Sequence, residues 1–241
     1  MGVCVKWDYA QAIYNTFKPY HKKAHNVSCE LTMNKTNWLI ILCILASVFL
    51  WFFVNDQIME YLVFSGENLQ KGRVWTILTS LFFHGDFTHL FGNMIFLYIF
   101  GNTIENELGE NWVLVPFFCG GIGSFILSVM FYDPTILLIG ASGAIFTLTA
   151  MVMLLKPLKF SFYFLMPLGL VALVYFSYNL LAFYMGSQGN VSYIGHIMGF
   201  LIGVPFGIAS SKDWIKNMLI TAGLFSVYLL IILVLLPSLN I

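Results

Sequence analysis

The stretch "GASGAIFTLTAMVMLL", residues 140–155, places one serine among small residues and continues as a mostly apolar run. From Ala141 to Leu155 the run has 15 residues. An α-helix of this length is about 22 Å long, whereas the hydrocarbon core of a bilayer is about 30 Å thick. We therefore expect a transmembrane helix whose outer end lies below the membrane surface and leaves room for water above Ser142.

The composition of the whole chain supports a membrane location. Of its 241 residues, 59% are hydrophobic and 9% are charged, compared with about 25% charged residues in soluble domains. The four cysteines are scattered and show no CxxC spacing, which indicates neither a disulfide framework nor a zinc site. The sequence also lacks HExxH, and we expect no metal, no cofactor and no nucleic-acid partner.

Apolar runs of approximately spanning length predict seven transmembrane helices. They cover residues 38–54, 87–101, 112–132, 141–155, 160–185, 192–210 and 214–236. A shorter run, 74–83, abuts the second helix and is predicted to be interfacial or re-entrant rather than spanning. The sequence thus predicts an all-α polytopic membrane protein.

The distribution of basic residues predicts the orientation. A cytoplasmic N-terminus would put nine basic residues on the cytoplasmic side, namely Lys6, Lys18, Lys22, Lys23, Lys35, Lys156, Lys159, Lys212 and Lys216. Only Lys71 and Arg73 would then lie on the opposite side. The loop after the second helix carries Glu105, Glu107 and Glu110 without a basic residue, but acidic residues count for little in this rule.

A few polar side chains lie within the predicted spans, where such residues are costly and indicate a functional site. The second span carries His89 and Asn93 and is preceded by His84, the fourth carries Ser142, and the sixth carries His196. All three spans enter from the outer side, and each carries its polar residues near that entry. These residues are therefore predicted to share one depth and to form one site that opens to the non-cytoplasmic side.

This set of residues suits acyl transfer. Ser142 at a helix start has unpaired backbone N–H groups and the positive end of the helix dipole beside it, which can stabilise an oxyanion. His196 is the histidine available as its base. No intramembrane aspartate remains to orient His196, so we predict a dyad in which ring packing, for example by Phe146, takes the place of a third member. His89 and Asn93 can donate hydrogen bonds to the developing charge.

Structural explanations of the same residues stay open. The glycines of "GASG" and the fourfold spacing of Gly195, Gly199 and Gly203 are typical of closely packed membrane helices. His89 and Asn93 suit an interhelical hydrogen-bonding pair. Buried histidines can also form a proton or ion relay, as in a transporter or channel, although no acidic residues align with them at the midplane.

Three segments resemble the signature segments of the rhomboid intramembrane serine proteases, in the order of that family. They are "HGDFTHLFGN" with His84, His89 and Asn93, "GASG" from Gly140 to Gly143, and "GHIMGFLIG" with His196, Gly199 and Gly203. The resemblance implies that Ser142 is the nucleophile and His196 the base. It also implies that His89 and Asn93, with backbone N–H groups including that of Ser142, form the oxyanion hole.

The resemblance extends from about residue 71 to 210. It implies a six-helix core (38–210), an N-terminal cytoplasmic arm (1–37), and an added seventh helix with a short tail (211–241). Glu105 and Gly109 match the family's E-x-x-x-G, in which the glutamate is structural. The usual Trp-Arg pair of the first outer loop is Trp75-Thr76 here, with the nearest arginine at Arg73.

Two further departures concern packing beside the base. The aromatic residue that is often tyrosine is Phe146, and the small residue before the base, usually alanine, is Gly195. The family activity would be hydrolysis of peptide bonds in or near transmembrane segments that carry small or helix-destabilising residues. Substrate entry is expected beside the fifth helix and the first outer loop. A rhomboid-like pseudoprotease that only binds membrane helices is the other alternative, but such relatives generally lack the serine or the histidine.

Overall fold

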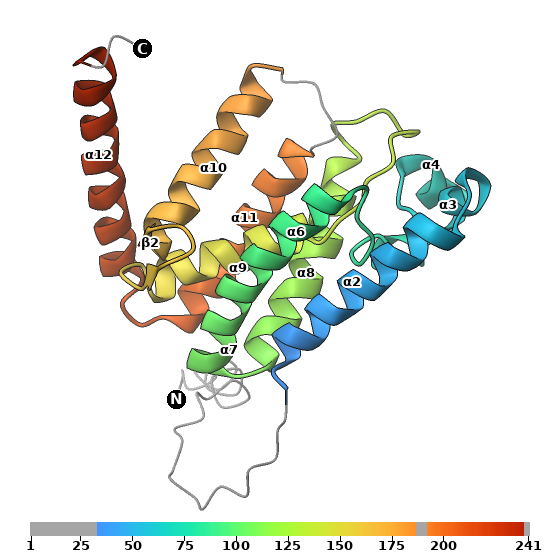
Figure 1. The fold of residues 1–241 in the computed structure, drawn as a ribbon, viewed down its shortest axis with the longest axis horizontal. Coiled ribbons are helices and arrows are strands. Elements are labelled where there is room, and N and C mark those ends of the chain that lie inside the picture. Colours follow the sequence, from blue (N-terminus) through green and yellow to red (C-terminus); the bar gives the residue numbers. More distant parts are fainter. Residues whose placement is uncertain (1–32, 187–191, 239–241) are drawn as a thin grey trace, which may run out of the picture.

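The computed structural model describes residues 33–186 and 192–238 (Figure 1). The long helices are α2 (Lys35–Phe53), α8 (Asn111–Ser128), α9 (Ser142–Leu155), α10 (Leu168–Tyr184), α11 (Tyr193–Ser210) and α12 (Trp214–Ser238). Between α2 and α8 a continuous helical run consists of α6 (Phe87–Phe96), the π-helical turn η1 (Leu97–Gly101) and α7 (Asn102–Leu108). The shorter elements are α3 (Asp56–Leu62), α4 (Gly66–Gln70), α5 (Thr76–Thr79), and the strands β1 (Phe160–Ser161) and β2 (Met166–Pro167).

Helix α9 is the central helix of the bundle and is packed against α6, α8, α10 and α11 (Figure 1). Every residue from Gly143 to Leu154 is buried, as expected for a helix that is apolar on all sides. On α11, a Cβ atom at Gly199 or Gly203 would overlap backbone atoms of Gly143 or Thr147. Glycine therefore lets the backbones of α9 and α11 meet, which is the usual basis of close packing between membrane helices.

The helices have the length and surface of a membrane protein. By length and composition, four helices of the described residues can cross a membrane: α2, α8, α11 and residues Trp214–Val234 of α12. Helices α9 and α10 are shorter and apolar. Many large apolar side chains of α2, α10 and α12 are exposed, which suits contact with lipid. The structure confirms the predicted all-α polytopic membrane fold.

Two predicted helix boundaries were wrong by about two turns, and the third helix ends at Ser128 rather than at residue 132. The fifth helix begins at Leu168 rather than at residue 160, because β1 and β2 pair as a small antiparallel hairpin. An apolar run does not by itself distinguish helix from strand, and Pro167 cannot donate a backbone hydrogen bond inside a helix. The second helix continues beyond Gly101 to Leu108. There Gly101 lies against Thr36 of α2, whose Cγ2 would be 2.6 Å from an added Cβ.

The loop between α2 and α6 is held together by short contacts between its own residues. Within the predicted non-spanning segment 74–83, α5 is a helix of four residues. The indole N–H of Trp75 donates to the carbonyl oxygen of Tyr61 at 2.8 Å. The Arg73 guanidinium lies 3.9 Å from the centre of the Tyr61 ring. The tryptophan and the arginine, separated here by one residue, thus both connect the second half of the loop to α3 at Tyr61.

Glu105 links the second helical run to the start of α2. Its carboxylate accepts hydrogen bonds from the backbone N–H of Lys35 at 2.6 Å and of Thr36 at 2.8 Å, and from the Thr36 hydroxyl at 2.6 Å. A negative charge that accepts the first amides of a helix stabilises that helix. Gly109 ends α7 with φ +96°, in the left-handed region that favours glycine.

Two glutamates, one near the end of α7 and one just before α8, form ion pairs with lysines. Glu110 pairs with Lys35 at 3.7 Å, and Glu107 pairs with Lys156 at 3.0 Å. The first residue of α2 and the residue after α9 therefore lie at the same end of the bundle as these two glutamates. Of the predicted N-terminal arm, 1–37, the part before residue 33 lies outside the described residues.

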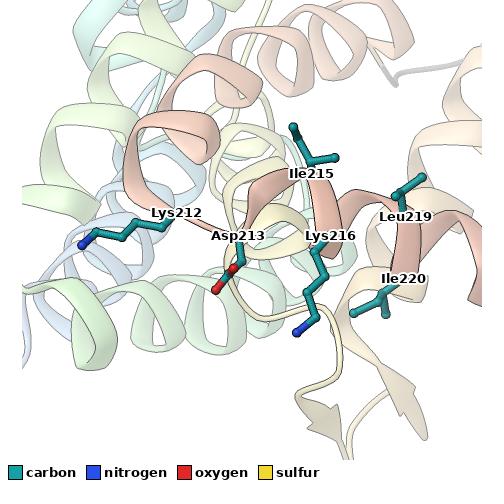
Figure 2. Close-up of a pocket in the computed structure, with 6 residues that line it drawn as sticks. All are labelled: Lys212, Asp213, Ile215, Lys216, Leu219 and Ile220. Carbon is teal, nitrogen blue, oxygen red and sulfur yellow. The ribbon is translucent and has the colours of Figure 1, made fainter.

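A surface hollow lies at the start of α12 and is lined by Lys212, Asp213, Ile215, Lys216, Leu219 and Ile220 (Figure 2). It lies near the C-terminal end of α9, because the Asn217 side-chain amide donates to the carbonyl oxygen of Leu154 at 2.8 Å. Ser142 is twelve residues before Leu154 in the same helix, which corresponds to about 18 Å along the helix axis. The hollow is therefore remote from Ser142.

Candidate active site

Ser142 is the first residue of α9 and is partly exposed, in contrast to the buried residues that follow it. Two residues earlier, Gly140 has φ +116°, a conformation that side chains disfavour. The Gly140 N–H donates to the carbonyl oxygen of Ser80 at 2.9 Å, which ties this turn to the loop between α2 and α6. Ala141 provides no side-chain cap, so the first amides of α9 are available to an anion.

His89 and Asn93 lie on α6 against the turn before Ser142. A Cβ atom at Gly140 would be 2.9 Å from both Cε1 and Nε2 of His89, and 3.7 Å from Nδ2 of Asn93. Asp86 caps α6, because its carboxylate accepts the His89 backbone N–H at 2.8 Å. The absence of a side chain at Gly140 therefore lets both polar side chains reach the start of α9.

The side chain of Asn93 has a hydrogen-bond donor without a partner among the described residues. Its Nδ2 atom is buried and makes no hydrogen bond to any described residue. An unpaired buried donor is costly and rare in native structures, and such a group requires an explanation. A ligand acceptor beside Gly140 would satisfy this donor.

His84 is fully buried and both of its ring nitrogens are engaged. Its Nε2 accepts the Ala141 backbone N–H at 3.4 Å, and its Nδ1 lies 3.1 Å from the Ser47 hydroxyl. Because Nε2 accepts, Nδ1 carries the proton and donates to Ser47, whose hydroxyl in turn lies 3.3 Å from the Phe82 carbonyl oxygen. His84 thus links α2 to the residue preceding Ser142.

His196 lies in the first turn of α11, across the glycine contact from α9. The N-cap Ser192 accepts the Gly195 backbone N–H at 3.3 Å. The His196 ring stacks on Phe146, with 4.6 Å between the ring centres and 13° between the planes. Residues 142 and 146 share one face of α9, so His196 lies on the same side of α9 as Ser142.

Asn179 of α10 is a site residue that the sequence analysis missed. Its Oδ1 lies 2.6 Å from His196 Nδ1, and its Nδ2 donates to the Tyr175 carbonyl oxygen at 2.8 Å. Asn179 is the only asparagine of α10, and it lies in an otherwise apolar segment. A lone amide in a membrane helix was the signal that could have revealed it.

The structure brings some predicted residues together and leaves others apart. Ser142, His89, Asn93, Phe146 and His196 gather near the N-terminal end of α9. Within the described part of the chain, the Ser142 hydroxyl makes no hydrogen bond, so it is not hydrogen-bonded to His196. Hydrogen bonds between catalytic side chains are often long in enzymes without a bound substrate. The remaining predicted residues, Glu105, Gly109, Gly199 and Gly203, contribute to caps and helix packing.

Comparison with known proteins identifies the family of this chain. Residues 71–213 match the family model described as "Rhomboid domain". The chain is 28% identical over 176 residues to RHOMBOID-like protein 12, mitochondrial, of Arabidopsis thaliana, an alignment that covers 64% of this chain and 52% of that protein. It is 30% identical over 146 residues to Rhomboid-like protease 1 of Toxoplasma gondii, covering 60% of this chain and 50% of that protein.

The aligned region spans about half the length of these two relatives. The family match nevertheless covers more than half of this chain and includes the end of the loop before α6, the central helix α9 and the glycine-packed helix α11. This chain therefore belongs to the rhomboid family.

Proposed function

We propose that this protein is an intramembrane serine endopeptidase that hydrolyses peptide bonds in or near the transmembrane segments of other membrane proteins. The observation that carries the proposal is the unpaired Nδ2 donor of Asn93 beside Gly140, two residues before the partly exposed Ser142. On the same side of α9 as Ser142, the His196 ring is held by Asn179 and Phe146. A nucleophile, a base and a vacant donor at one helix start support acyl transfer.

In the proposed mechanism, Ser142 Oγ attacks the carbonyl carbon of the scissile bond and its proton passes to His196 Nε2. The resulting oxyanion accepts hydrogen bonds from the Ser142 amide, His89 and Asn93 Nδ2. The intermediate collapses, the C–N bond breaks, and His196 gives its proton to the leaving amine. Water then attacks the acyl-enzyme with His196 again as base, and this step releases the second product and restores Ser142.

The substrate of this reaction is a membrane helix. Its peptide bonds are hydrogen-bonded within the helix, so the segment has to unwind locally before a carbonyl group reaches Ser142. Small or helix-destabilising residues near the cleaved bond lower the cost of that unwinding. The exposed apolar surface of the helices provides the bilayer contact through which such a substrate arrives.

Reconstitution in liposomes with a tagged single-span substrate, containing glycine and alanine near its outer end, tests the activity. We expect cleavage by the wild type and no cleavage by Ser142→Ala or His196→Ala. Ser226→Ala is the matched control, because Ser226 is an exposed serine of α12. A fluorophosphonate probe should label the wild type and Ser226→Ala but not Ser142→Ala. Cleavage that survives in Ser142→Ala would overturn the proposal.

We further propose that the active site opens to the non-cytoplasmic side. Lys35 and Lys156 lie at the opposite end of the bundle from Ser142 and would face the cytoplasm under the positive-inside rule. Seven spans with a cytoplasmic N-terminus put the C-terminus on the non-cytoplasmic side. Alkaline phosphatase is active only outside the cytoplasm, so a C-terminal phosphatase fusion should be active. An inactive phosphatase fusion, together with an active cytoplasmic reporter fused at the same place, would show that the protein has the opposite orientation.

A further inference from the structure

We infer that Asn179 is a positioning residue for the His196 base, so that Ser142 and His196 operate as part of a Ser-His-Asn set. This inference rests on the proposed function of Ser142 and His196. It concerns α10, which carries none of the residues that the sequence analysis assigned to the site. The contact itself is short, with 2.6 Å between Asn179 Oδ1 and His196 Nδ1.

The second hydrogen bond of the amide determines which way it faces. The carbonyl oxygen of Tyr175, one helical turn earlier, can only accept, and Asn179 Nδ2 donates to it at 2.8 Å. The amide oxygen therefore faces His196. Because that oxygen can only accept, His196 Nδ1 has to carry the proton.

The tautomer that results is the one that a general base needs. With the proton on Nδ1, the lone pair lies on Nε2, and within the described residues Nε2 of His196 makes no hydrogen bond. This is the role that the third member plays in serine and cysteine proteases, in which Asp or Asn orients the histidine. A neutral amide does this without burying a carboxylate, whose desolvation would be costly at membrane depth.

The surroundings make Asn179 effective as a support. Its side chain is 1% exposed, so water cannot readily replace it. The bond to Tyr175 restrains the amide, and Phe146 covers one face of the imidazole. The ring is thus held in its plane by Asn179 and on its face by Phe146.

A purely structural role would be a hydrogen bond between α10 and α11, which contributes to stability alone. The test therefore compares two variants of similar size, Asn179→Leu and Asn179→Asp. Leucine removes the acceptor, whereas aspartate keeps an oxygen opposite His196 Nδ1. Leu180→Ala, at an exposed neighbour on the same helix, is the control for disturbance of α10.

The purified variants are assayed for kcat, KM and the rate of fluorophosphonate labelling at Ser142, alongside thermal unfolding in detergent. We expect Asn179→Leu to lower kcat and the labelling rate by about 10- to 100-fold with little change in KM, which is part of the effect of a general base. Asn179→Asp should retain several-fold more activity than Asn179→Leu, and Leu180→Ala should match the wild type.

Two results would overturn the inference while leaving the proposed function intact. One is wild-type kcat and labelling in folded Asn179→Leu. The other is an equal loss in Asn179→Leu and Asn179→Asp that follows their loss of thermal stability. If Ser142→Ala still cleaves substrate, the proposed function itself fails, and Asn179 loses its assigned role with it.

Discussion

At the C-terminal end of α9 the backbone carbonyl groups are paired with α12, whereas at its N-terminal end polar side chains lack partners. The Asn217 side-chain amide donates to the carbonyl oxygens of Leu154 at 2.8 Å and Leu155 at 3.3 Å. Among the described residues, neither the Ser142 hydroxyl nor Asn93 Nδ2 makes a hydrogen bond. Because unpaired polar groups at membrane depth oppose folding, we expect function at the N-terminal end and structural support at the other.

The sharpest test of this contrast is Asn93→Leu, which replaces the unpaired donor by an apolar side chain of similar size. Loss of one oxyanion donor lowers kcat by about 10²- to 10³-fold. The thermal stability should stay unchanged or rise, because the donor has no protein partner to lose. Kinetics of substrate cleavage and thermal unfolding in detergent measure both effects. An Asn93→Leu protein that unfolds early but has wild-type kcat would instead make Asn93 a packing residue.

His84→Phe tests the residue that links α2 to the start of α9. The ring volume remains, but the Ala141 N–H and the Ser47 hydroxyl each lose a partner. We expect the free energy of unfolding to fall by about 1–3 kcal/mol. Because Ala141 precedes Ser142, kcat should fall by about tenfold, which is about 1.4 kcal/mol in the barrier. Equal stability of His84→Phe and wild type would show that these hydrogen bonds contribute nothing to folding.

Phe146→Leu probes the face of the His196 ring. Contacts between stacked rings contribute about 0.5–1.5 kcal/mol, so we expect kcat to fall by about two- to tenfold. Phe146→Tyr keeps the stacked ring and should retain wild-type kcat. If both variants lose activity equally, the ring contact seen at 4.6 Å does not support the base.

Helices could be predicted from this sequence because an apolar run long enough to span a bilayer has to satisfy its own backbone hydrogen bonds there, and a helix does so. The prediction failed where tertiary contacts decide. Gly101 followed by acidic residues was interpreted as a helix end, yet Glu105 lies in the continuing helix and caps α2. Residues 160–167 were interpreted as helix, yet they pair as a hairpin before Pro167. Neither outcome is encoded in local composition.

The candidate site could be predicted as far as the depth of each polar residue in the membrane follows from the predicted spans. Ser142, His89 and His196 were assigned to one level, and the structure gathers them at one end of α9. Asn179 escaped because it is uncharged and because its partner, 17 residues later, lies on another helix. The pairing of an amide with one nitrogen of a ring depends on side-chain geometry, which the spacing of residues along the chain does not reveal.

Asn217→Ala tests the paired end of α9 and should have the smallest effect on catalysis. The substitution leaves the carbonyl oxygens of Leu154 and Leu155 without the amide that now donates to them, so the free energy of unfolding should fall by about 1–3 kcal/mol. The change lies about 18 Å along α9 from Ser142, and the kcat of the folded protein should equal that of wild type. A kcat as low as that of Phe146→Leu, at unchanged stability, would mean that α12 acts on the site and that the two ends of α9 are coupled.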